Sequence, residues 1–144
     1  MPYSLENSKA LYKEGCRHLV GSVNSPVRAF KSVGGTPVFI KKGKGDKVYD
    51  IDNNEYIDMV GSYGPMILGH ANEEVLTIVK KAAEKSFSYG ASTEKEIELA
   101  QIIKNSFDSI DNIRFVNSGT EAVFSAIRLA RAYTNKNKII KFAG

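Results

Sequence analysis

The spacing of apolar and polar residues changes character along the chain. Residues 37–60 alternate with a period of two, and turn residues at 43–46 and 52–54 separate the apolar runs. This pattern predicts a small antiparallel β meander. In residues 73–86, and again from 93 to 107, apolar residues recur at helical spacing. The sequence therefore predicts a β segment followed by helices.

Two further segments lie before the meander. Residues 5–20 predict a short helix with few apolar anchors. Residues 21–36 are rich in Gly, Ser, Asn and Pro and predict a loop rather than a regular element. A loop of this length is uncommon in a compact protein unless it has a function.

The last third of the chain predicts a βαβ unit. Residues 112–117 and 138–142 have the composition of strands, and residues 120–134 have an apolar face at helical spacing. Parallel sheets need more than two strands and cover on both faces. We therefore expect an α/β fold whose sheet is incomplete, as the first part of a larger protein. The alternative is an unusual small α+β domain.

Composition and charge narrow the class. The chain has 144 residues, of which 42% are hydrophobic and 25% charged, as expected for one globular domain or part of one. Its 20 basic and 16 acidic residues give a net charge of +4, and the lysines are dispersed, which argues against a nucleic-acid binder. Cys16 is the only cysteine, which excludes an internal disulfide. With no apolar run of membrane-spanning length and no targeting signal, we expect a cytoplasmic setting without a membrane partner.

The clearest candidate site is Asn117-Ser118-Gly119-Thr120-Glu121, between a predicted strand and a predicted helix. A helix start offers unpaired N–H groups and the positive end of the helix dipole, which suit a phosphate. Gly119 allows an anion to approach closely, and Ser118 and Thr120 carry hydroxyl donors. The same residues also form a plain capping box, Ser118-x-x-Glu121. Spacing alone favours the plain cap, because caps occur at most helices.

Two loop segments are further candidates. In Asn24-Ser25-Pro26-Val27-Arg28, the proline stiffens the loop and Arg28 could clamp a carboxylate through two parallel N–H bonds. The alternative is a solvated arginine. In Gly61-Ser62-Tyr63-Gly64-Pro65, an aromatic ring between glycines follows a strand, an arrangement that can line a pocket. The alternative is a tyrosine that covers the core.

Three other motifs are rejected. Gly43-x-Gly45 lacks the third glycine of a dinucleotide-binding loop, and no helix follows. Asp50-x-Asp52-x-Asn54 resembles the start of a calcium loop, but Glu55 stands where that loop requires glycine, so we predict a hairpin turn. His18 and His70 lack metal-ligand neighbours, so we expect structural roles for both and no metal site.

Three stretches together resemble one family. They are VNSPVRAFKSVGGTPVFIKKGKGDKVYDID from Val23, EYIDMVGSYGPMILGHA from Glu55 and RFVNSGTEAVFSAIRLARAYT from Arg114. They are similar to the N-terminal third of the glutamate-1-semialdehyde 2,1-aminomutases. These enzymes belong to the fold type I, or class III aminotransferase, group of pyridoxal-phosphate enzymes. The SGTEA element fits many related aminotransferases, whereas NSPVR points to the aminomutases.

The resemblance implies a fold and an activity. Residues 1–60 would form an N-terminal arm, a substrate loop and the meander, and residues 61–144 would begin the cofactor-binding large domain. The family converts glutamate 1-semialdehyde into 5-aminolevulinate, a tetrapyrrole precursor. It moves an amino group within one carbon skeleton and uses pyridoxal 5'-phosphate, which passes through its pyridoxamine form. The full-length proteins are homodimers that act on a small-molecule substrate.

The resemblance also implies the site residues. It assigns Ser118, Gly119 and Thr120 to the cofactor phosphate, and Ser25, Arg28 and Tyr63 to the substrate. Tyr63 stands where the family usually has tryptophan, so the ring is kept and an indole N–H is lost. Other departures are Ser22 in place of a usual glycine and Ser92 in place of a usual proline.

The chemistry of the family needs groups that this chain lacks. The sequence stops before the Cys-Tyr-His-Gly segment, whose aromatic ring stacks on the cofactor, and none of its lysines matches the Schiff-base lysine. Transamination needs a base that moves a proton and an electron sink held at the pyridine nitrogen. We therefore expect no catalytic residue in this chain and no activity from the chain alone. The alternatives are a fragment of another class III aminotransferase, a non-catalytic truncated paralogue that binds a full-length partner, and a simple phosphate-binding module.

Overall fold

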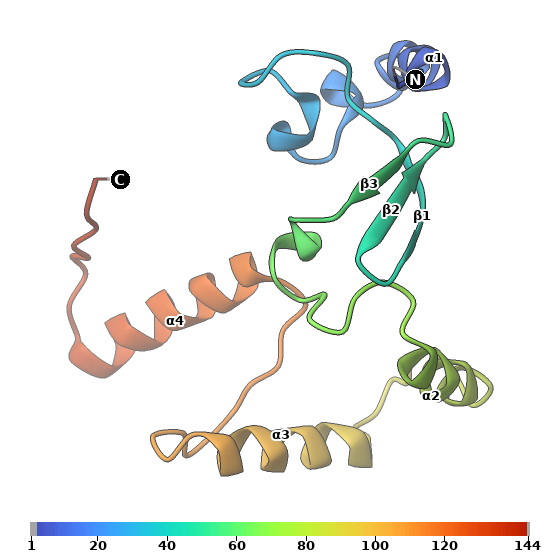
Figure 1. Ribbon diagram of the computed structural model, residues 1–144. Coiled ribbons are helices and arrows are strands. Elements are labelled where there is room, and N and C mark those ends of the chain that lie inside the picture. Colours follow the sequence, from blue (N-terminus) through green and yellow to red (C-terminus); the bar gives the residue numbers. More distant parts are fainter. Residues whose placement is uncertain (1–2, 144) are drawn as a thin grey trace. The chain divides into compact units, whose positions relative to one another are not determined.

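The computed structural model describes residues 3–143, and these divide between Phe87 and Ser88 into two compact units (Figure 1). The first unit holds helix α1, a three-stranded sheet and helix α2, together with three single 3-10 turns. The second unit holds helices α3 and α4. The resemblance implies a different boundary, between the substrate-binding segment that ends at residue 60 and the cofactor-binding domain that begins at residue 61. That boundary stays a prediction.

The predicted meander is confirmed. Strands β1 (Ile40–Lys44), β2 (Lys47–Asp50) and β3 (Glu55–Ile57) form an antiparallel sheet in the order β1-β2-β3. Gly45 has a φ of +58° in the turn from β1 to β2, a conformation that glycine adopts without steric cost. The predicted hairpin turn between β2 and β3 is also present, with Asn53 at a φ of +65°.

The N-terminal helix and the loop form as expected. Helix α1 spans Glu6–Gly15, shorter than the predicted range. The following loop contains two single turns, η1 (Val20–Ser22) and η2 (Pro26–Ala29), and no longer element before the sheet. Pro26 lies at the start of η2, where its fixed φ suits a helical turn.

The three amphipathic segments form helices, and each helix begins directly after an N-terminal capping residue. Helix α2 spans Glu73–Ala83, and the Asn72 side chain accepts a hydrogen bond from Val75 N at 3.1 Å. Helix α3 spans Glu94–Ser106 and begins with a capping box formed by Thr93 and Glu96. Helix α4 spans Gly119–Thr134 and ends at Asn135 in the left-handed conformation.

The two strands predicted on either side of α4 are wrong in this structure. Residues 113–117 and 135–143 have no regular secondary structure, and the three strands of the described chain are all in the meander. A parallel strand gains its hydrogen bonds from a neighbour in the sheet. Residues 3–143 supply no partner strand to either segment, so α4 is the part of the predicted βαβ unit that forms.

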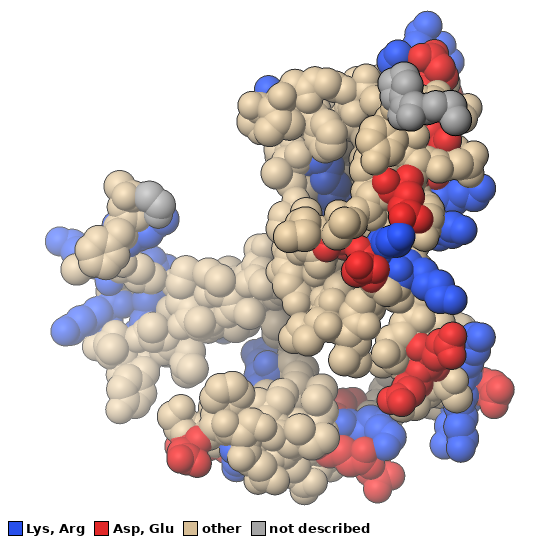
Figure 2. All heavy atoms as spheres, in the orientation of Figure 1, with Lys and Arg blue, Asp and Glu red and all other residues tan. Residues whose placement is uncertain are grey.

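Little of the described chain is buried. Ala29 and Pro37 are its buried apolar residues, and the buried polar residues are Ser8, Ser22 and Asp50. On the visible face, basic side chains lie beside acidic ones over α1, the sheet and α2, in agreement with the dispersed charge of the sequence (Figure 2). Among residues 3–143, no helix is long and apolar enough to span a bilayer.

Candidate functional site

The N-terminus of α4 is capped by the side chain of Ser118. Ser118 is extended, with φ −151° and ψ 159°, and its Oγ accepts a hydrogen bond from the backbone N–H of Glu121 at 3.2 Å. The Glu121 carboxylate turns back and accepts the N–H of Asn117 at 2.7 Å. The plain cap that the spacing favoured is therefore present.

Two backbone donors remain at this helix start. Within residues 3–143, no hydrogen bond uses the N–H groups of Gly119 and Thr120, which are the first two of the helix. A Cβ built on Gly119 would meet no atom within 4 Å, so the space beside the Gly119 Cα is open. Two free N–H groups, an exposed Thr120 hydroxyl and the helix dipole fit a phosphate group.

A groove runs along α4 beside this terminus. It has a volume of about 780 Å³, and its wall includes Arg114, Thr120, Phe124 and Arg128. Ser118 and Gly119 do not line it. Thr120 is thus the one predicted phosphate-binding residue that belongs to both the helix start and the groove.

Ser25 and Arg28 are brought together by the η2 turn. The backbone N–H of Arg28 donates to the carbonyl of Ser25 at 3.0 Å. Ser25 is half-buried and lines a hollow of about 320 Å³ with Asn24, Ala29 and Lys31, among others. The Arg28 side chain is exposed and forms no ion pair within the described residues. Its guanidinium is therefore free to bind a carboxylate.

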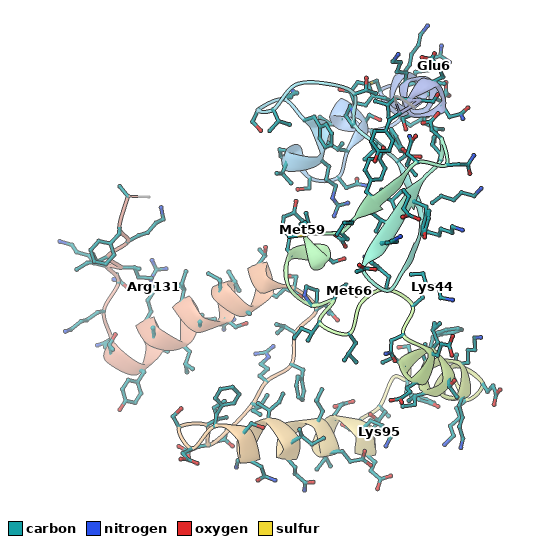
Figure 3. The ribbon with its side chains drawn as sticks, viewed as in Figure 1. Glu6, Lys44, Met59, Met66, Lys95 and Arg131 are labelled. Atoms are coloured by element: carbon teal, nitrogen blue, oxygen red, sulfur yellow. The ribbon has the colours of Figure 1, made fainter. Side chains whose placement is uncertain are left out.

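Tyr63 lies on a different turn of the first unit, and the structure does not support the alternative that it covers the core. It ends the single turn η3 (Gly61–Tyr63), has a φ of +64° and is 71% exposed. The labelled Met59 and Met66 mark the segment that carries it in Figure 3. The ring is accessible to a ligand.

A histidine–aspartate pair lies next to this turn, and no motif in the sequence predicts it. His70 Nε2 lies 2.6 Å from Asp58 Oδ2, and both side chains are largely buried. The hydrogen bond from His70, aided by the N–H groups of Val60 and Gly61, holds the pKa of Asp58 below its ordinary value. His70 is thus held by a hydrogen bond within the first unit. Among residues 3–143, no group of three or more potential metal ligands occurs. The two residues are twelve positions apart on either side of a loop, and no periodic sequence pattern relates residues in such an arrangement.

A second buried carboxylate was also missed. Asp50 is fully buried at the end of β2 and accepts four hydrogen bonds. Their donors are the N–H groups of Asp52 and Asn54, the Asn54 amide and the Tyr56 hydroxyl. The carboxylate that resembled a calcium ligand is therefore saturated by the chain's own donors, which confirms the hairpin-turn interpretation.

Comparison with known proteins adds a family. The sequence model of the aminotransferase class-III family matches residues 30–144. The glutamate-1-semialdehyde 2,1-aminomutase of Thermodesulfovibrio yellowstonii is 61% identical over 137 residues, which are 95% of this chain and 32% of that protein. The chain therefore spans about a third of the length of the curated relatives it matches.

Solved structures of similar fold include transaminases. One described as a transaminase with PLP bound is 34% identical, with a TM-score of 0.85 over 96% of this chain and 31% of that one. An omega-transaminase from Sphaerobacter thermophilus is 32% identical, with a TM-score of 0.84 over 92% of this chain and 30% of that one. The described residues thus have the fold of the N-terminal part of such enzymes.

Proposed function

The chain belongs to the class III aminotransferase family, and from that premise we propose that it is the N-terminal third of a glutamate-1-semialdehyde 2,1-aminomutase. The complete enzyme would convert glutamate 1-semialdehyde into 5-aminolevulinate, in a pathway that leads to tetrapyrroles. The observation that carries the proposal is the 61% identity to such an aminomutase over nearly the whole chain. The NSPVR segment, Asn24–Arg28, supports the aminomutase over other members of the family.

The cofactor of the proposed enzyme is pyridoxal 5'-phosphate, whose phosphate would bind at Ser118, Gly119 and Thr120. When bound, it supplies the electron sink that amino-group transfer requires. Gly119 and Thr120 would each donate a backbone N–H, and the hydroxyls of Ser118 and Thr120 would complete the contacts. The open space at Gly119 lets the phosphate approach the backbone closely.

The substrate carboxylate would bind in the first unit. Arg28 would hold it through two N–H bonds, since its guanidinium is exposed and unpaired in the described chain. Ser25, on the same turn, would donate its hydroxyl to the same carboxylate. The exposed Tyr63 ring would pack beside the substrate and exclude water from it.

In the proposed enzyme, this chain would bind and orient the cofactor and the substrate, and the rest of the enzyme would move protons. The complete enzyme would be a cytoplasmic homodimer, as the resemblance and the sequence lead us to expect. The 144-residue chain is proposed to have no activity alone, because none of its lysines matches the family's cofactor-binding lysine.

The assay for this proposal uses the complete enzyme that carries this chain. It should form 5-aminolevulinate from glutamate 1-semialdehyde with no 2-oxo acid added. Thr120→Val should weaken cofactor binding, measured by absorbance titration, whereas Thr134→Val at the other end of α4 should not. Arg28→Met should raise KM with less effect on cofactor affinity. Absence of 5-aminolevulinate formation by the unmodified enzyme would refute the proposal.

A second candidate is an aminotransferase that acts between two molecules. The similarity to the Sphaerobacter omega-transaminase favours it, since that structure matches nine-tenths of the chain at 32% identity. Such an enzyme would need an external 2-oxo acid as acceptor. Dependence of turnover on that acceptor separates the two candidates in one assay.

A further inference from the structure

We propose that His70 and Asp58 are positioning residues that hold the turn presenting Tyr63. The inference rests on the proposed function, which gives the Tyr63 ring a contact with the substrate. The His70–Asp58 pair joins the two ends of the segment 58–70, and Tyr63 lies within it.

The Asp58 carboxylate connects the pair to the turn. Its Oδ2 meets His70 Nε2 at 2.6 Å, while its Oδ1 accepts the N–H groups of Val60 at 2.9 Å and Gly61 at 3.1 Å. A single carboxylate thus fixes both the histidine and the first residues of the turn. The contact with His70 is the shortest of the three and is made by a side chain from the other end of the segment.

His70 is itself fixed to the sheet. Its backbone exchanges two hydrogen bonds with Gly45, at 2.9 Å and 2.8 Å, in the turn from β1 to β2. Its ring lies against Gly43, where a Cβ would come within 2.5 Å of the His70 Cγ. The Asp58 N–H donates to the Asp46 carbonyl at 2.8 Å. The pair therefore ties the turn to the β1–β2 hairpin.

The turn needs such a support because its backbone is strained. Gly61, Ser62, Tyr63 and Gly64 all have positive φ angles, of 54°, 54°, 64° and 116°. Residues with a Cβ disfavour this region and stay in it only when the surroundings hold them there. The Tyr63 ring is 71% exposed, so packing does not hold it. Its position depends on the backbone of the turn, which Asp58 holds at Val60 and Gly61.

Kinetics of the complete enzyme test the inference. His70→Ala should lower kcat/KM for glutamate 1-semialdehyde roughly tenfold, mainly through KM, because a small displacement of a contact residue has effects of this size. His70→Gln keeps an N–H donor of similar reach and should recover most of the loss. His18→Gln is the matched control, since His18 is exposed and pairs with Glu14 on α1.

A double substitution separates positioning from general stability. If His70 acts through Tyr63, the variant carrying both Tyr63→Ala and His70→Ala should be no more impaired than Tyr63→Ala alone. Losses that multiply would overturn the inference. So would an impaired Tyr63→Ala enzyme beside an unimpaired His70→Ala enzyme, and that result would leave the proposed function intact.

Amide hydrogen exchange reads the support itself, without activity. In His70→Ala, the N–H groups of Gly61 and Tyr63 should exchange at least tenfold faster, while those of β2 keep their protection. Unchanged exchange at Gly61 and Tyr63 would overturn the inference whatever the kinetics. Faster exchange together with a fully active Tyr63→Ala enzyme would show that His70 holds the turn. The same result would refute the contact between Tyr63 and the substrate that the proposed function assigns.

Discussion

The carboxylate of Asp52, in the turn between β2 and β3, caps the first turn of α1 through Ser8. It accepts the Ser8 hydroxyl at 2.7 Å, the Ser8 N–H at 2.9 Å and the N–H of Asn7 at 2.7 Å. The residue at the N-cap position is Leu5, whose side chain cannot accept a hydrogen bond. A residue 44 positions away therefore supplies the cap and attaches the helix to the sheet.

Replacing Asp52 should weaken the N-terminal unit. Asp52→Ala removes the acceptor for three donors, and we expect the melting temperature to fall by roughly 5 °C, as for the loss of a helix cap. Thermal unfolding followed by circular dichroism measures this. Asp46→Ala is the matched control, since its exposed side chain forms no hydrogen bond within the described residues. Equal melting temperatures for the two variants would contradict the capping role.

The same cap predicts a pH dependence. Partial burial raises the pKa of Asp52, but the hydrogen bonds from Ser8 and Asn7 outweigh it and hold the pKa below its ordinary value. A depressed pKa contributes stability that is present above the ordinary value and lost as pH falls through the folded-state value. The difference between Asp52→Ala and the unsubstituted chain should therefore shrink below about pH 4.

Tyr56 should titrate apart from the other tyrosines. Burial and the hydrogen bond to Asp50 raise its pKa to about 12. A raised pKa contributes stability that is present below the ordinary value near 10 and lost as pH rises toward 12. The pKa of Tyr49 is also raised, by its hydrogen bond with Glu55. The diagnostic signal in tyrosinate absorbance is therefore a group that titrates near pH 12 and is absent in Tyr56→Phe. A Tyr56→Phe titration curve that keeps the late group would disprove the assignment.

Local patterns were sufficient to predict the elements that need only local contacts. The meander follows from the period of two and the turn residues, and α2, α3 and α4 follow from the helical spacing of their apolar residues. The strands expected at 112–117 and 138–142 do not form, because a strand depends on a partner that these residues lack. The prediction was wrong for the two segments whose structure depends on hydrogen bonds from a neighbouring strand.

The candidate site divides in the same way. Ser25 with Arg28, and the helix start at 118–120, lie in continuous motifs, and their local geometry could be predicted. The pair of Asp58 and His70 could not, because it joins residues that no spacing rule relates and its partners are set by the sheet. Supporting contacts of this kind are tertiary, and a single sequence does not reveal them.

Ser22 is strained and should be improved by glycine. It has a φ of +60° and is 5% exposed, and its buried Oγ has no hydrogen-bond partner among residues 3–143. Glycine relieves the left-handed backbone and removes the unsatisfied hydroxyl, so Ser22→Gly should stabilise the chain by about 1 kcal/mol in urea unfolding. A decrease in stability would show that the side chain's packing outweighs both effects.

The neighbouring Gly15 provides a linked test of the same contact. A Cβ on Gly15 would lie 2.1 Å from the Ser22 Oγ. Gly15→Ala should therefore cost about 2 kcal/mol in the unsubstituted chain, as overpacking does. The cost should be clearly smaller in the Ser22→Gly background, because the clashing atom is gone. Equal costs in the two backgrounds would place the clash elsewhere.

The apolar surface of α4 should make the isolated chain associate. Val123, Phe124, Leu129 and Tyr133 are each more than half exposed on this helix, and exposed apolar area of this kind promotes association. Leu129→Lys should lower dye binding by 8-anilinonaphthalene-1-sulfonate and shift the sedimentation profile toward monomer. Ala130→Lys adds the same charge beside it without removing a large apolar side chain and should have a smaller effect. An equal reduction from both substitutions would mean that net charge, rather than the apolar surface of α4, controls association.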